Sequence, residues 1–367
     1  MMKNRRETDR TGGILKQLGK LVKELGSAIR SNVWFLEGSE ANTGKSLRIL
    51  FAGGDKQKDY IAGLVFDGAC RETSAGKLYF WNILYLIHRN SNNFALAFIE
   101  GRRLHQLLYQ GAKDYYIPLW LESCVELPLK ATTKGAKEDL RRIRKHQLTY
   151  ELSTDLEALQ DFYNNMYLAT IHARHEKSAV SSSFEEFSGV VSSSDNKLLL
   201  VKHGETAIAG VVLQMTAVPR LWIAGIRDSS NTYRRMGAVG ATYHFPAQYL
   251  TEQGYRQMSL GRSRSFFNDG VLQYKAKWNH HLSGFDKDGM VVKMLTASDA
   301  LLGFLGNQPF ACVEHGELHA TVFIDASNQS NERKLKEIDA LRSLQGLAGV
   351  SVFSLDRKQC EFQKLNQ

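Results

Sequence analysis

The chain has 367 residues, 43% of them hydrophobic and only five of them proline, which excludes a largely disordered or low-complexity protein. This length predicts two domains with room for a small further unit. The formal charge of +9 is concentrated, because residues 1–30 carry eight Lys or Arg against three acids and residues 134–145 carry six against two. Two local basic elements favour a partner with localised negative charge, such as phosphate groups or a lipid surface, over a broad nucleic-acid face.

The sequence predicts a cytoplasmic protein, with peripheral contact to the inner membrane face as a second option. The amino-terminal residues are charged and polar, unlike a secretion signal. The longest apolar run, Leu78–Ile87, is interrupted by Asn82 and is shorter than the roughly 20 residues that span a bilayer. The four cysteines have neither disulfide nor metal spacing. No metal is expected, since His172 and His175 lack a suitably spaced third ligand.

Residues 1–30 are predicted to form a basic amphipathic helix. Apolar residues recur there every three or four positions, with lysines beside them. The apolar stripe consists of Ile14, Leu15, Leu18, Leu21, Val22, Leu25 and Ile29. Two interpretations stay open: the helix packs on its own protein, which is the more ordinary case, or it lies on an anionic lipid surface.

Residues 31–133 are predicted to form an amino-terminal domain built on a mixed sheet. Runs rich in β-branched and aromatic residues predict strands, and one segment between them predicts a helix. The expected strands are Ser46–Phe51, Tyr60–Phe66, Leu78–Ile87, Phe94–Glu100 and Tyr116–Leu121, and the expected helix is Arg103–Tyr109.

Residues 134–300 carry the most informative order of elements. A basic helix at Lys134–His146 and a strand at Tyr150–Leu152 precede a helix whose start, Thr154 to Glu157, has the capping-box pattern. A helix near Phe184–Val191 comes next. The elements after it are the strands Lys197–Lys202, Ala207–Thr216 and Leu221–Ile226, the loop Asp228–Gly240, a helix to about Gln253, and the strand Met258–Leu260. A strand that feeds a glycine-bearing helix start can hold a pyrophosphate, because the first N–H groups of a helix are unpaired.

Residues 301–367 are predicted to form a small α/β tail. Strands are expected at His319–Ile324 and Val350–Leu355. The apolar residues Leu335, Ile338, Leu341 and Leu344 recur at helical spacing between them. We expect structural packing rather than ligand binding here.

Two common nucleotide or hydrolase motifs are not met. Ser39–Ser46 has the Gly-Lys-Ser ending of a P-loop, but the required first glycine is displaced and a strand is expected after it instead of a helix. Gly261–Ser265 falls one glycine short of a nucleophile elbow. A surface turn and an ordinary strand end are the better interpretations.

The order of elements in residues 134–294 resembles the Gcn5-related N-acyltransferase (GNAT) fold, in particular its Fem-type and CelD-like branch. The resemblance depends on short segments in a fixed order: Asp139–Lys145, Phe162-Tyr163, Met166-Tyr167, Arg174-His175, Gly254-Tyr255, Asp269-Gly270 and Tyr274–Trp278. It implies an α/β (α+β) protein with two tandem GNAT-like domains and largely antiparallel mixed sheets. The implied domains are 31–133, a degenerate copy, and 134–300, the acyltransferase domain, with the helix 1–30 before them and the tail 301–367 after them.

The resemblance implies an acyl-CoA donor, with no metal, held at the loop that opens the helix after Ile226. The cofactor-binding residues it implies are Ile226, Arg234, Arg235, Gly237, Ala238, Gly240 and Ala241. This chain departs from the pattern in two places. Val239 stands where a small residue is expected, and Pro246 lies inside the helix, where it removes a backbone bond.

The resemblance also implies a catalytic set and an acceptor site. A backbone N–H near Gly225 would stabilise the oxyanion, Asp228 or His175 would act as base, and Tyr167 or Tyr243 would protonate the leaving group. The implied acceptor site contains Arg174, Arg262, Arg264, Lys275 and Lys277, a basic set that suits a phosphorylated or nucleotide-linked sugar.

Three functions follow as hypotheses. The first is N-acyl transfer from acyl-CoA to an amine of a sugar, lipid or amino acid in bacterial cell-surface polymer metabolism. The second is a Fem-type transferase that uses aminoacyl-tRNA. The basic helix at residues 134–145 and the imperfect pyrophosphate loop favour this hypothesis. The third is a non-catalytic scaffold with a degenerate fold, docked to a membrane by residues 16–30.

Overall fold

The computed structural model describes residues 30–102, 114–175, 183–192, 196–325, 332–356 and 361–365. Two expected elements, the amphipathic helix before Arg30 and the helix Arg103–Tyr109, lie outside these residues. Among the helices that are described, none combines the length and the apolarity needed to cross a membrane. The chain forms three mixed sheets in which antiparallel pairs predominate, which confirms the expected α/β class.

The first sheet has the strand order β3-β1-β2-β4-β13-β5. Its strands are β1 (Arg30–Ser39), β2 (Ser46–Gly53), β3 (Arg71–Tyr79), β4 (Leu96–Arg102), β5 (Asp114–Pro118) and β13 (Asp288–Met294). Strands β2 and β4 are parallel. The segment that connects them contains helix α2 (Asp55–Val65), strand β3 and helix α3 (Phe80–Arg89). The turn Ser39–Ser46 is followed by strand β2 and not by a helix. A P-loop needs a helix at this place, so the expectation that this segment is no P-loop is confirmed.

Two strand predictions in this half were wrong. Tyr60–Phe66 belongs largely to helix α2, and Leu78–Ile87 contains the end of β3 and most of helix α3. In each helix the buried apolar residues are four apart, Ile61 with Val65 and Ile83 with Ile87. That spacing puts them on one helical face, whereas the continuous apolar runs suggested buried strands.

The second sheet has the strand order β12-β6-β11-β10-β9-β8-β7. Its strands are β6 (Leu121–Glu126), β7 (Thr149–Ser153), β8 (Lys197–His203), β9 (Thr206–Gln214), β10 (Arg220–Ile226), β11 (Gln257–Ser263) and β12 (His281–Phe285). The pairs from β7 to β10 are antiparallel, and β10 is parallel to β11. Helix α10 (Ala238–Glu252) makes the crossover, so the expected GNAT-like meander is confirmed.

Helices cover both faces of the second sheet. Helix α5 (Lys134–Lys145) and α10 pack on one face, where Leu199, Val211 and Leu213 are buried. Helix α6 (Leu156–Asp161), the π-helix η2 (Phe162–Leu168), α7 (Ala169–His175) and α8 (Phe184–Ser192) belong to the other side. There, Leu198, Leu200 and Val212 are buried. Successive side chains of a strand point to opposite faces of the sheet, so neighbouring residues of β8 and β9 belong to different cores.

Two local predictions in this half need correction. Helix α6 is capped by Asp155, whose side chain accepts a hydrogen bond from the Ala158 N–H, and not by Thr154. The expected loop Asp228–Gly240 is mostly helical, since it contains α9 (Asn231–Met236) and the start of α10. A left-handed glycine, Gly237, joins the two helices without a longer loop. Helix α10 continues through Pro246.

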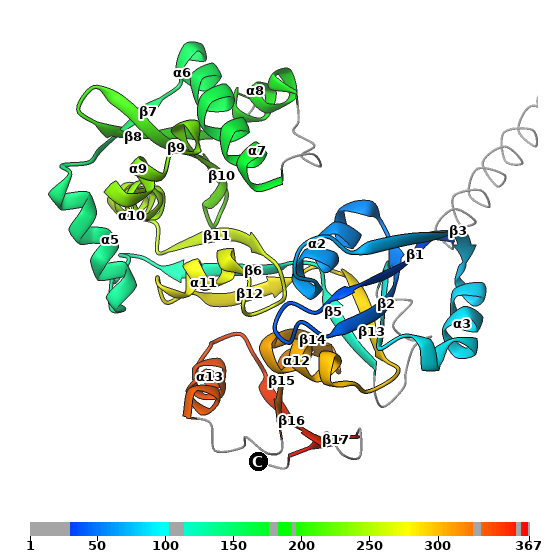
Figure 1. Ribbon diagram of the computed structural model, residues 1–367. Helices are drawn as coiled ribbons and strands as arrows, with labels where there is room; N and C mark the ends of the chain where they lie inside the picture. The colour runs from blue at the N-terminus through cyan, green and yellow to red at the C-terminus, as the bar shows by residue number, and fades with distance from the viewer. Residues whose placement is uncertain are drawn as a thin grey trace, which may run out of the picture.

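The two halves share a topological unit and exchange a strand. The unit β2–α2–β4 is followed by β5 and then β6, and the unit β10–α10–β11 is followed by β12 and then β13. In each case the last strand crosses to the other sheet, so that β6 lies between β11 and β12 while β13 lies between β4 and β5 (Figure 1). This pattern supports two tandem GNAT-like units. The exact domain boundaries at 30/31, 133/134 and 300/301 stay predictions.

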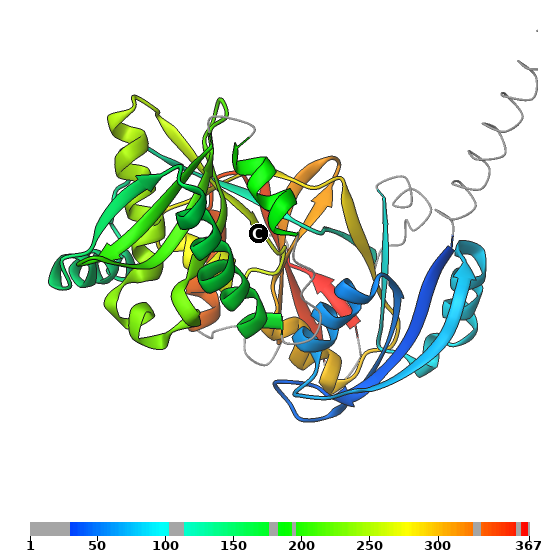
Figure 2. The same ribbon diagram turned by 90° about the horizontal axis from the view of Figure 1, so that it is seen from above.

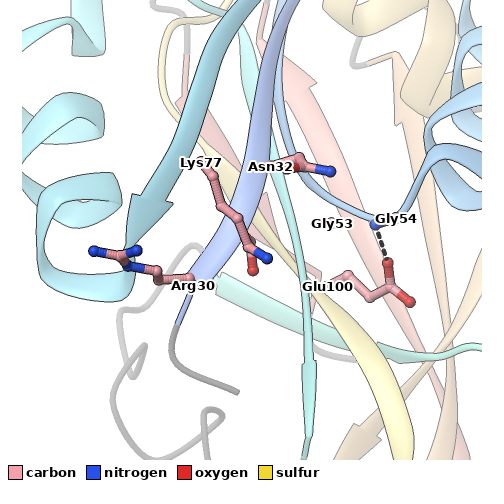
Figure 3. A pocket seen from close by; sticks show the side chains of 7 residues that line it. Arg30, Asn32, Gly53, Gly54, Lys77 and Glu100 are labelled. Atoms are coloured by element: carbon pink, nitrogen blue, oxygen red, sulfur yellow. Dashed lines mark hydrogen bonds between the residues drawn. The ribbon is translucent and has the colours of Figure 1, made fainter. Parts of the chain in front are cut away.

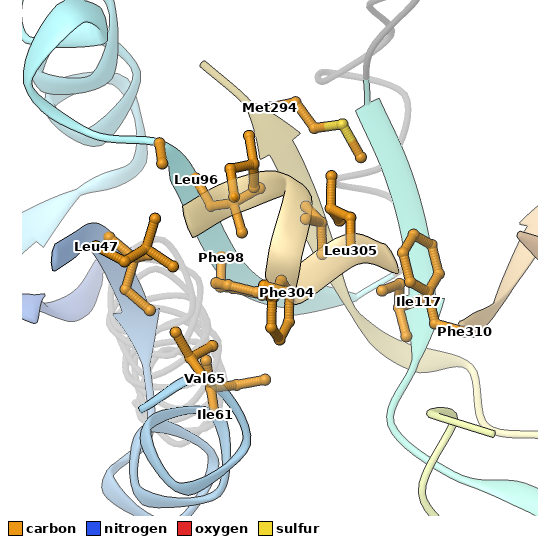
Figure 4. Close-up of a cluster of buried hydrophobic side chains, with 14 of the residues drawn as sticks. Leu47, Ile61, Val65, Leu96, Phe98, Ile117, Met294, Phe304, Leu305 and Phe310 are labelled. Carbon is orange, nitrogen blue, oxygen red and sulfur yellow. The ribbon is translucent and has the colours of Figure 1, made fainter. Parts of the chain in front are cut away.

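The carboxy-terminal segment completes the core of the first half. It consists of α12 (Asp299–Asn307), β14 (Phe310–Glu314), β15 (Glu317–Asp325), α13 (Glu332–Arg342), β16 (Gly349–Asp356) and β17 (Glu361–Lys364). Strands β15 and β16 are parallel and α13 connects them, as the βαβ prediction requires. Phe304 and Leu305 of α12 are buried beside Leu96 and Phe98 of β4 (Figure 4). This segment, in orange and red, lies below both halves in Figure 1 and projects onto the middle of the molecule in Figure 2.

Candidate functional site

The parallel strands β10 and β11 diverge at the centre of the second sheet. They pair at Arg220 and Ser259, whereas β10 pairs with β9 from Arg220 to Ile226. Beyond Arg220 the second edge of β10 has no strand partner in the described sheet, and we call this unpaired stretch between β10 and β11 the opening. The backbone around Gly225, where the sequence analysis expected an oxyanion donor, belongs to this stretch of β10.

One hydroxyl group shows how the backbone of β10 is oriented in this opening. The Ile226 N–H donates to Oγ1 of the buried Thr170 in α7, at 2.9 Å, so this N–H points away from β9. Successive N–H groups of a strand point to alternate edges. The N–H of Ala224 therefore points to the same edge as that of Ile226, into the opening, while the N–H of Gly225 points to β9. Ala224 is also exposed.

The π-helix η2 passes directly over Gly225. A Cβ atom on this glycine would lie 2.5 Å from the carbonyl carbon of Met166 and 2.6 Å from the backbone nitrogen of Tyr167. Only glycine allows this approach, which explains the residue at this position. Because π-helical turns are frequent at functional sites, the crossing of η2 over β10 marks this part of the sheet as a candidate site.

Tyr167 projects from η2 into an aromatic group. Its ring stacks on Phe187 of α8 at 6.0 Å and lies 5.7 Å from the ring of Tyr163. Phe187 in turn stacks on Trp222 of β10. Burial, followed by the neighbouring Tyr163, raises the pKa of the Tyr167 phenol above its ordinary value. Tyr167 is thus a protonated hydroxyl at neutral pH, close to the strand that carries Ala224.

The structure separates the two tyrosines predicted to protonate the leaving group. Tyr243 lies on α10, at the opposite face of the sheet from Tyr167, and its ring stacks on Trp278 at 6.2 Å. Asp228 is exposed in the turn after β10. Arg174 and His175 form the end of α7, and their side chains lie outside the described structure. Gly225 and Tyr167 are therefore the pair that the structure brings into contact.

The glycines of the expected pyrophosphate loop contact helix α5. A Cβ on Gly237 would lie 3.0 Å from Cβ of Arg142, and one on Gly240 would lie 2.7 Å from Cβ of Asp139. Ala238 and Ala241 are fully buried in the same core. These small residues let two helices approach closely, so α5 fills the space beside them that an open anion cradle would need.

The two arginines of this loop have different surroundings. Arg234 donates from Nη2 to Oγ of Ser229 at 2.9 Å and is half-buried, while Arg235 is exposed at the end of α9. Ile226, the remaining residue of the expected cofactor set, is buried with its N–H bound to Thr170. Of the expected set, Arg235 is thus the cation most accessible to a phosphate group.

A buried carboxylate in the basic helix escaped the sequence analysis. Asp139 is 6% exposed and accepts a hydrogen bond from the Tyr274 hydroxyl at 2.7 Å, and Nζ of Lys277 lies 3.7 Å from the same oxygen. Burial, followed by the charge of Asp139, raises the pKa of Tyr274 above its ordinary value. Lys277 therefore neutralises a structural carboxylate between α5 and α11 (Gly270–Ala276).

Lys275 lies at the base of the opening between β10 and β11. It is 1% exposed and its Nζ donates to the carbonyl of Gly261, at 2.8 Å, from helix α11. Gly261 has a left-handed φ of +74°, and a Cβ there would lie 2.9 Å from the Leu221 carbonyl oxygen. Burial, and then the charge of Arg220, lowers the pKa of Lys275 to about 7. A neutral amine is therefore well populated at physiological pH.

Further buried polar atoms on β6, β10, β11 and the segment after α11 have no hydrogen-bond partner in the described structure. Burial, and then the charge of Lys275, lowers the pKa of His280 to about 4. Several buried atoms make no hydrogen bond in the described structure: Oγ of Ser123, Nε of Arg220, Oγ of Ser263 and Nδ1 of His280. Buried polar groups usually find partners, so this cluster has the capacity to bind water or ligand atoms. The serines looked like ordinary strand residues in the sequence.

The residues expected to form a basic acceptor site do not form one patch. Arg262 is half-exposed and lies 3.4 Å from Glu122, whereas Lys275 and Lys277 are engaged as described above. The guanidinium of Arg264 lies between the rings of Tyr60 and Trp120, at 4.3 and 4.0 Å from their centroids. Burial lowers the pKa of Arg264. Arg264 also donates to Gln57 of α2, so it connects the two halves.

A search of the described residues finds no group of His, Cys, Asp and Glu side chains that could hold a metal ion.

Comparison with known proteins gives structural similarity alone. No protein-family model matches the chain, and no curated protein matches it. The chain is similar to the solved structure of L-PGS from Bacillus licheniformis, at 12% identity over 74% of this chain and 84% of the other, with a TM-score of 0.37. It is similar to FemX at 12% identity over 70% and 83%, with a TM-score of 0.38.

A third similarity is to a GCN5-related N-acetyltransferase from Anabaena variabilis. The identity is 9%, over 79% of this chain and 71% of the other, and the TM-score is 0.31. At such values we derive nothing about chemistry from these proteins. The assignment of a GNAT-like fold follows from the sheet order, the parallel β10–β11 pair and the crossover helix of this chain.

Proposed function

We propose that the chain is an N-acyltransferase that transfers an acyl group from acyl-CoA to an amine acceptor at the opening between β10 and β11. The observation that carries this proposal is the divergence of the two strands after Arg220, with the N–H of Ala224 directed into the gap. A chain of backbone groups facing an opening can bind an extended thioester donor as a strand would be bound. The acceptor we expect is an amino sugar, lipid or amino acid of bacterial cell-surface polymer metabolism.

The chemistry needs an oxyanion donor and two proton transfers. The amine nitrogen attacks the thioester carbon, and the N–H of Ala224 stabilises the negative charge that develops on the carbonyl oxygen. The C–S bond then breaks, and the hydroxyl of Tyr167, protonated at neutral pH, gives its proton to the leaving thiolate. The amine must lose one proton to a base.

Lys275 is added to Asp228 and His175 as a candidate for that base. Its amine is partly neutral near pH 7, and it lies at the base of the same opening. Leu221, which adjoins Gly261, precedes Ala224 by three residues, or about 10 Å along a strand. Proton transfer to Lys275 would therefore pass through water, for which the unpartnered hydroxyl groups of Ser123 and Ser263 provide hydrogen-bonding positions.

One observation favours an alternative donor, aminoacyl-tRNA. The glycines Gly237 and Gly240, which would cradle the pyrophosphate of acyl-CoA, are covered by α5. The same helix carries six Lys or Arg, of which Arg141 and Arg142 are paired with Glu138. The remaining cations, Lys134, Lys137, Arg144 and Lys145, could contact tRNA phosphates. The oxyanion donor and Tyr167 would serve an ester donor in the same way.

Calorimetric titration distinguishes the donors. The protein is titrated with acetyl-CoA, with a long-chain acyl-CoA and with aminoacyl-tRNA. We expect acyl-CoA binding that weakens about tenfold in Arg235→Ala and less in Arg234→Ala, because Arg235 is the exposed cation. Binding of aminoacyl-tRNA without binding of acyl-CoA would move the proposal to the alternative, and binding of neither would refute both.

A second experiment tests the oxyanion donor. Ala224→Pro removes the N–H that faces the opening, while Ala224→Val retains it. Because this N–H points away from β9, the ladder between β9 and β10 should survive the substitution. We expect the proline variant to lose about 100-fold or more in acyl-transfer rate with donor binding retained, as for other oxyanion donors. Equal rates for both variants would contradict the assignment.

A further inference from the structure

Helix α3 exposes an aromatic stripe at the outer edge of the first half. The side chains of Trp81 and Tyr85 are 54% and 63% exposed, and they lie four residues apart on one face together with Arg89. Ile83 and Ile87 are buried on the opposite face. The buried face already anchors the helix, so the large exposed rings are available for a contact outside the chain.

The aromatic stripe continues onto the neighbouring strands. The ring of Tyr79 stacks on Trp81 with centroids 4.9 Å apart and planes 7° from parallel. The guanidinium of Arg30 lies 3.9 Å from the centroid of the Tyr79 ring, on its partner strand β1. Lys77 is two residues before Tyr79 on β3, so its side chain leaves the same face of the sheet.

A shallow hollow of about 270 Å³ adjoins this stack (Figure 3). It is lined by Arg30, Ser31, Asn32, Gly53, Gly54, Lys77 and Glu100. Glu100 accepts a hydrogen bond from the Gly54 N–H at 2.7 Å, so this carboxylate is engaged at the start of α2. Arg30 and Lys77 supply the positive charge of the hollow, which could accommodate a phosphate group.

The chain reaches this surface from a basic segment. Residues 1–29, which precede Arg30, carry seven Lys or Arg against three acids in the sequence. The described chain therefore begins at the point where the cations of the hollow and the exposed rings meet. Positive charge that could attract an anionic surface is therefore concentrated in the sequence immediately before Arg30.

We propose that the face formed by Arg30, Lys77, Tyr79, Trp81, Tyr85 and Arg89 docks on a bilayer that contains anionic phospholipid. Tryptophan and tyrosine favour the level of the lipid headgroups, because their rings are apolar and their N–H or O–H groups remain hydrated. Cations beside them attract anionic headgroups. A protein partner could also use exposed aromatic rings, but the cations at both ends of this face favour lipid phosphates. This proposal is independent of the transfer reaction.

The test is sedimentation of the full chain with vesicles of phosphatidylcholine alone and of phosphatidylcholine with phosphatidylglycerol. We expect strong binding to the mixed vesicles and weak binding to the neutral ones. The double variant Trp81→Ser/Tyr85→Ser and the double variant Arg30→Gln/Lys77→Gln should each lose at least about tenfold in affinity. The matched control is Leu156→Ser/Leu335→Ser, which removes two other exposed large side chains (61% and 46%) and should bind as the wild type does.

Tryptophan fluorescence supplies a second measurement at the site itself. Burial of Trp81 at the interface should shift the emission to shorter wavelength when mixed vesicles are added, and the shift should be reduced in Trp81→Phe, which keeps an apolar ring. Equal sedimentation with neutral vesicles would refute an anionic docking site. So would unchanged binding of the Trp81→Ser/Tyr85→Ser variant, or failure of the wild type to bind either vesicle.

Discussion

The two strand–helix–strand units of this chain have the same topology but different openings. In the first unit β2 and β4 pair over four residues, from Ile49 with Leu96 to Ala52 with Ile99. In the second unit β10 and β11 pair at Arg220 with Ser259 and then diverge. The comparison teaches that the fold supplies the crossover twice, while the pairing of its parallel strands decides which copy leaves the edge of its first strand unpaired.

The surroundings of the two openings explain the difference. In the second unit Gly261 of β11 is left-handed, and a Cβ atom on it would lie 2.9 Å from the Leu221 carbonyl oxygen. The register between β11 and β6 shifts between Ser259 and Gly261. Thr170 then binds the N–H of Ile226, which a neighbouring strand would otherwise bind. In the first unit Glu100 of β4 instead binds the N–H of Gly54 at the start of α2. In the first copy the two parallel strands therefore pair with each other, and in the second the hydroxyl group of Thr170 takes the place of a strand partner at Ile226.

The largest effect is expected from adding one methyl group in the open unit. Gly225→Ala places a Cβ 2.5 Å from the backbone of Met166, and backbone cannot yield as a side chain can. We expect the free energy of unfolding to fall by about 3 kcal/mol, measured by urea denaturation. Gly63→Ala in α2 is the matched control, since nothing lies within 4 Å of its Cβ. It should be neutral or stabilising by about 0.5–1 kcal/mol. Similar stability of the two variants would contradict the close packing of η2 on β10.

A pH dependence distinguishes the buried lysines of the two halves. The pKa of Lys275 is lowered from 10.5 to about 7, so between these values the unfolded chain binds a proton that the folded chain does not. Stability should therefore rise with pH, by about 2 kcal/mol from about pH 7.5 to about pH 9, and Lys275→Met should abolish this rise. Below about pH 7 both states are protonated and the curve flattens.

Lys58 of the first half is the control for this measurement. It is also buried, but Glu72 and Asp59 hold its pKa above the ordinary value. The contribution of the Lys58 ion pairs to the free energy of unfolding is complete below pH 10.5 and is lost only above that pH. The variant Lys58→Met should therefore keep the rise in stability between about pH 7.5 and about pH 9 that the wild type shows. A rise that persists in Lys275→Met would show that Lys275 is not the group responsible.

An intermediate effect on the free energy of unfolding is expected at Thr170, whose hydroxyl group accepts the hydrogen bond that a neighbouring strand would otherwise accept from Ile226. Thr170→Val keeps the shape of the side chain but leaves the buried N–H of Ile226 without an acceptor. We expect a loss of about 1.5 kcal/mol in unfolding free energy, while Thr170→Ser should lose less because the hydroxyl remains. Hydrogen exchange of the Ile226 amide gives a local measurement and should be faster in the valine variant. Unchanged exchange would contradict this role.

The smallest effect is expected at the corresponding position of the closed unit. Glu100→Gln retains an oxygen that can accept from the Gly54 N–H but removes the negative charge at the start of α2. A charge at an exposed helix start contributes about 0.5 kcal/mol, so thermal unfolding should shift only slightly. A loss above about 2 kcal/mol would instead show that β2 and β4 depend on this carboxylate as β10 depends on Thr170.

Residues close in sequence were the predictable part of the site. The strands β7 to β11 of the second sheet and the helices at Lys134–Lys145 and Phe184–Ser192 followed from periodicity, whereas β6 and β12 were not predicted. The apolar runs around Ile61 and Ile83 were wrongly predicted as strands, because a short continuous apolar run does not distinguish a buried strand from a helix. Gly225 was named as part of the expected oxyanion site, and the structure shows that it also leaves room for the backbone of η2.

The sequence by itself determined the order of elements from β7 to β11, including the meander and the crossover helix, and the concentration of positive charge, because these depend on spacing along the chain. Only the tertiary structure decided the exchange of β6 and β13, the closure of one unit and the opening of the other, and the burial of Lys275. Strand pairing and the desolvation of a charge depend on residues distant in sequence. Lys275 therefore looked like one of several surface cations until α11 placed it against the carbonyl of Gly261.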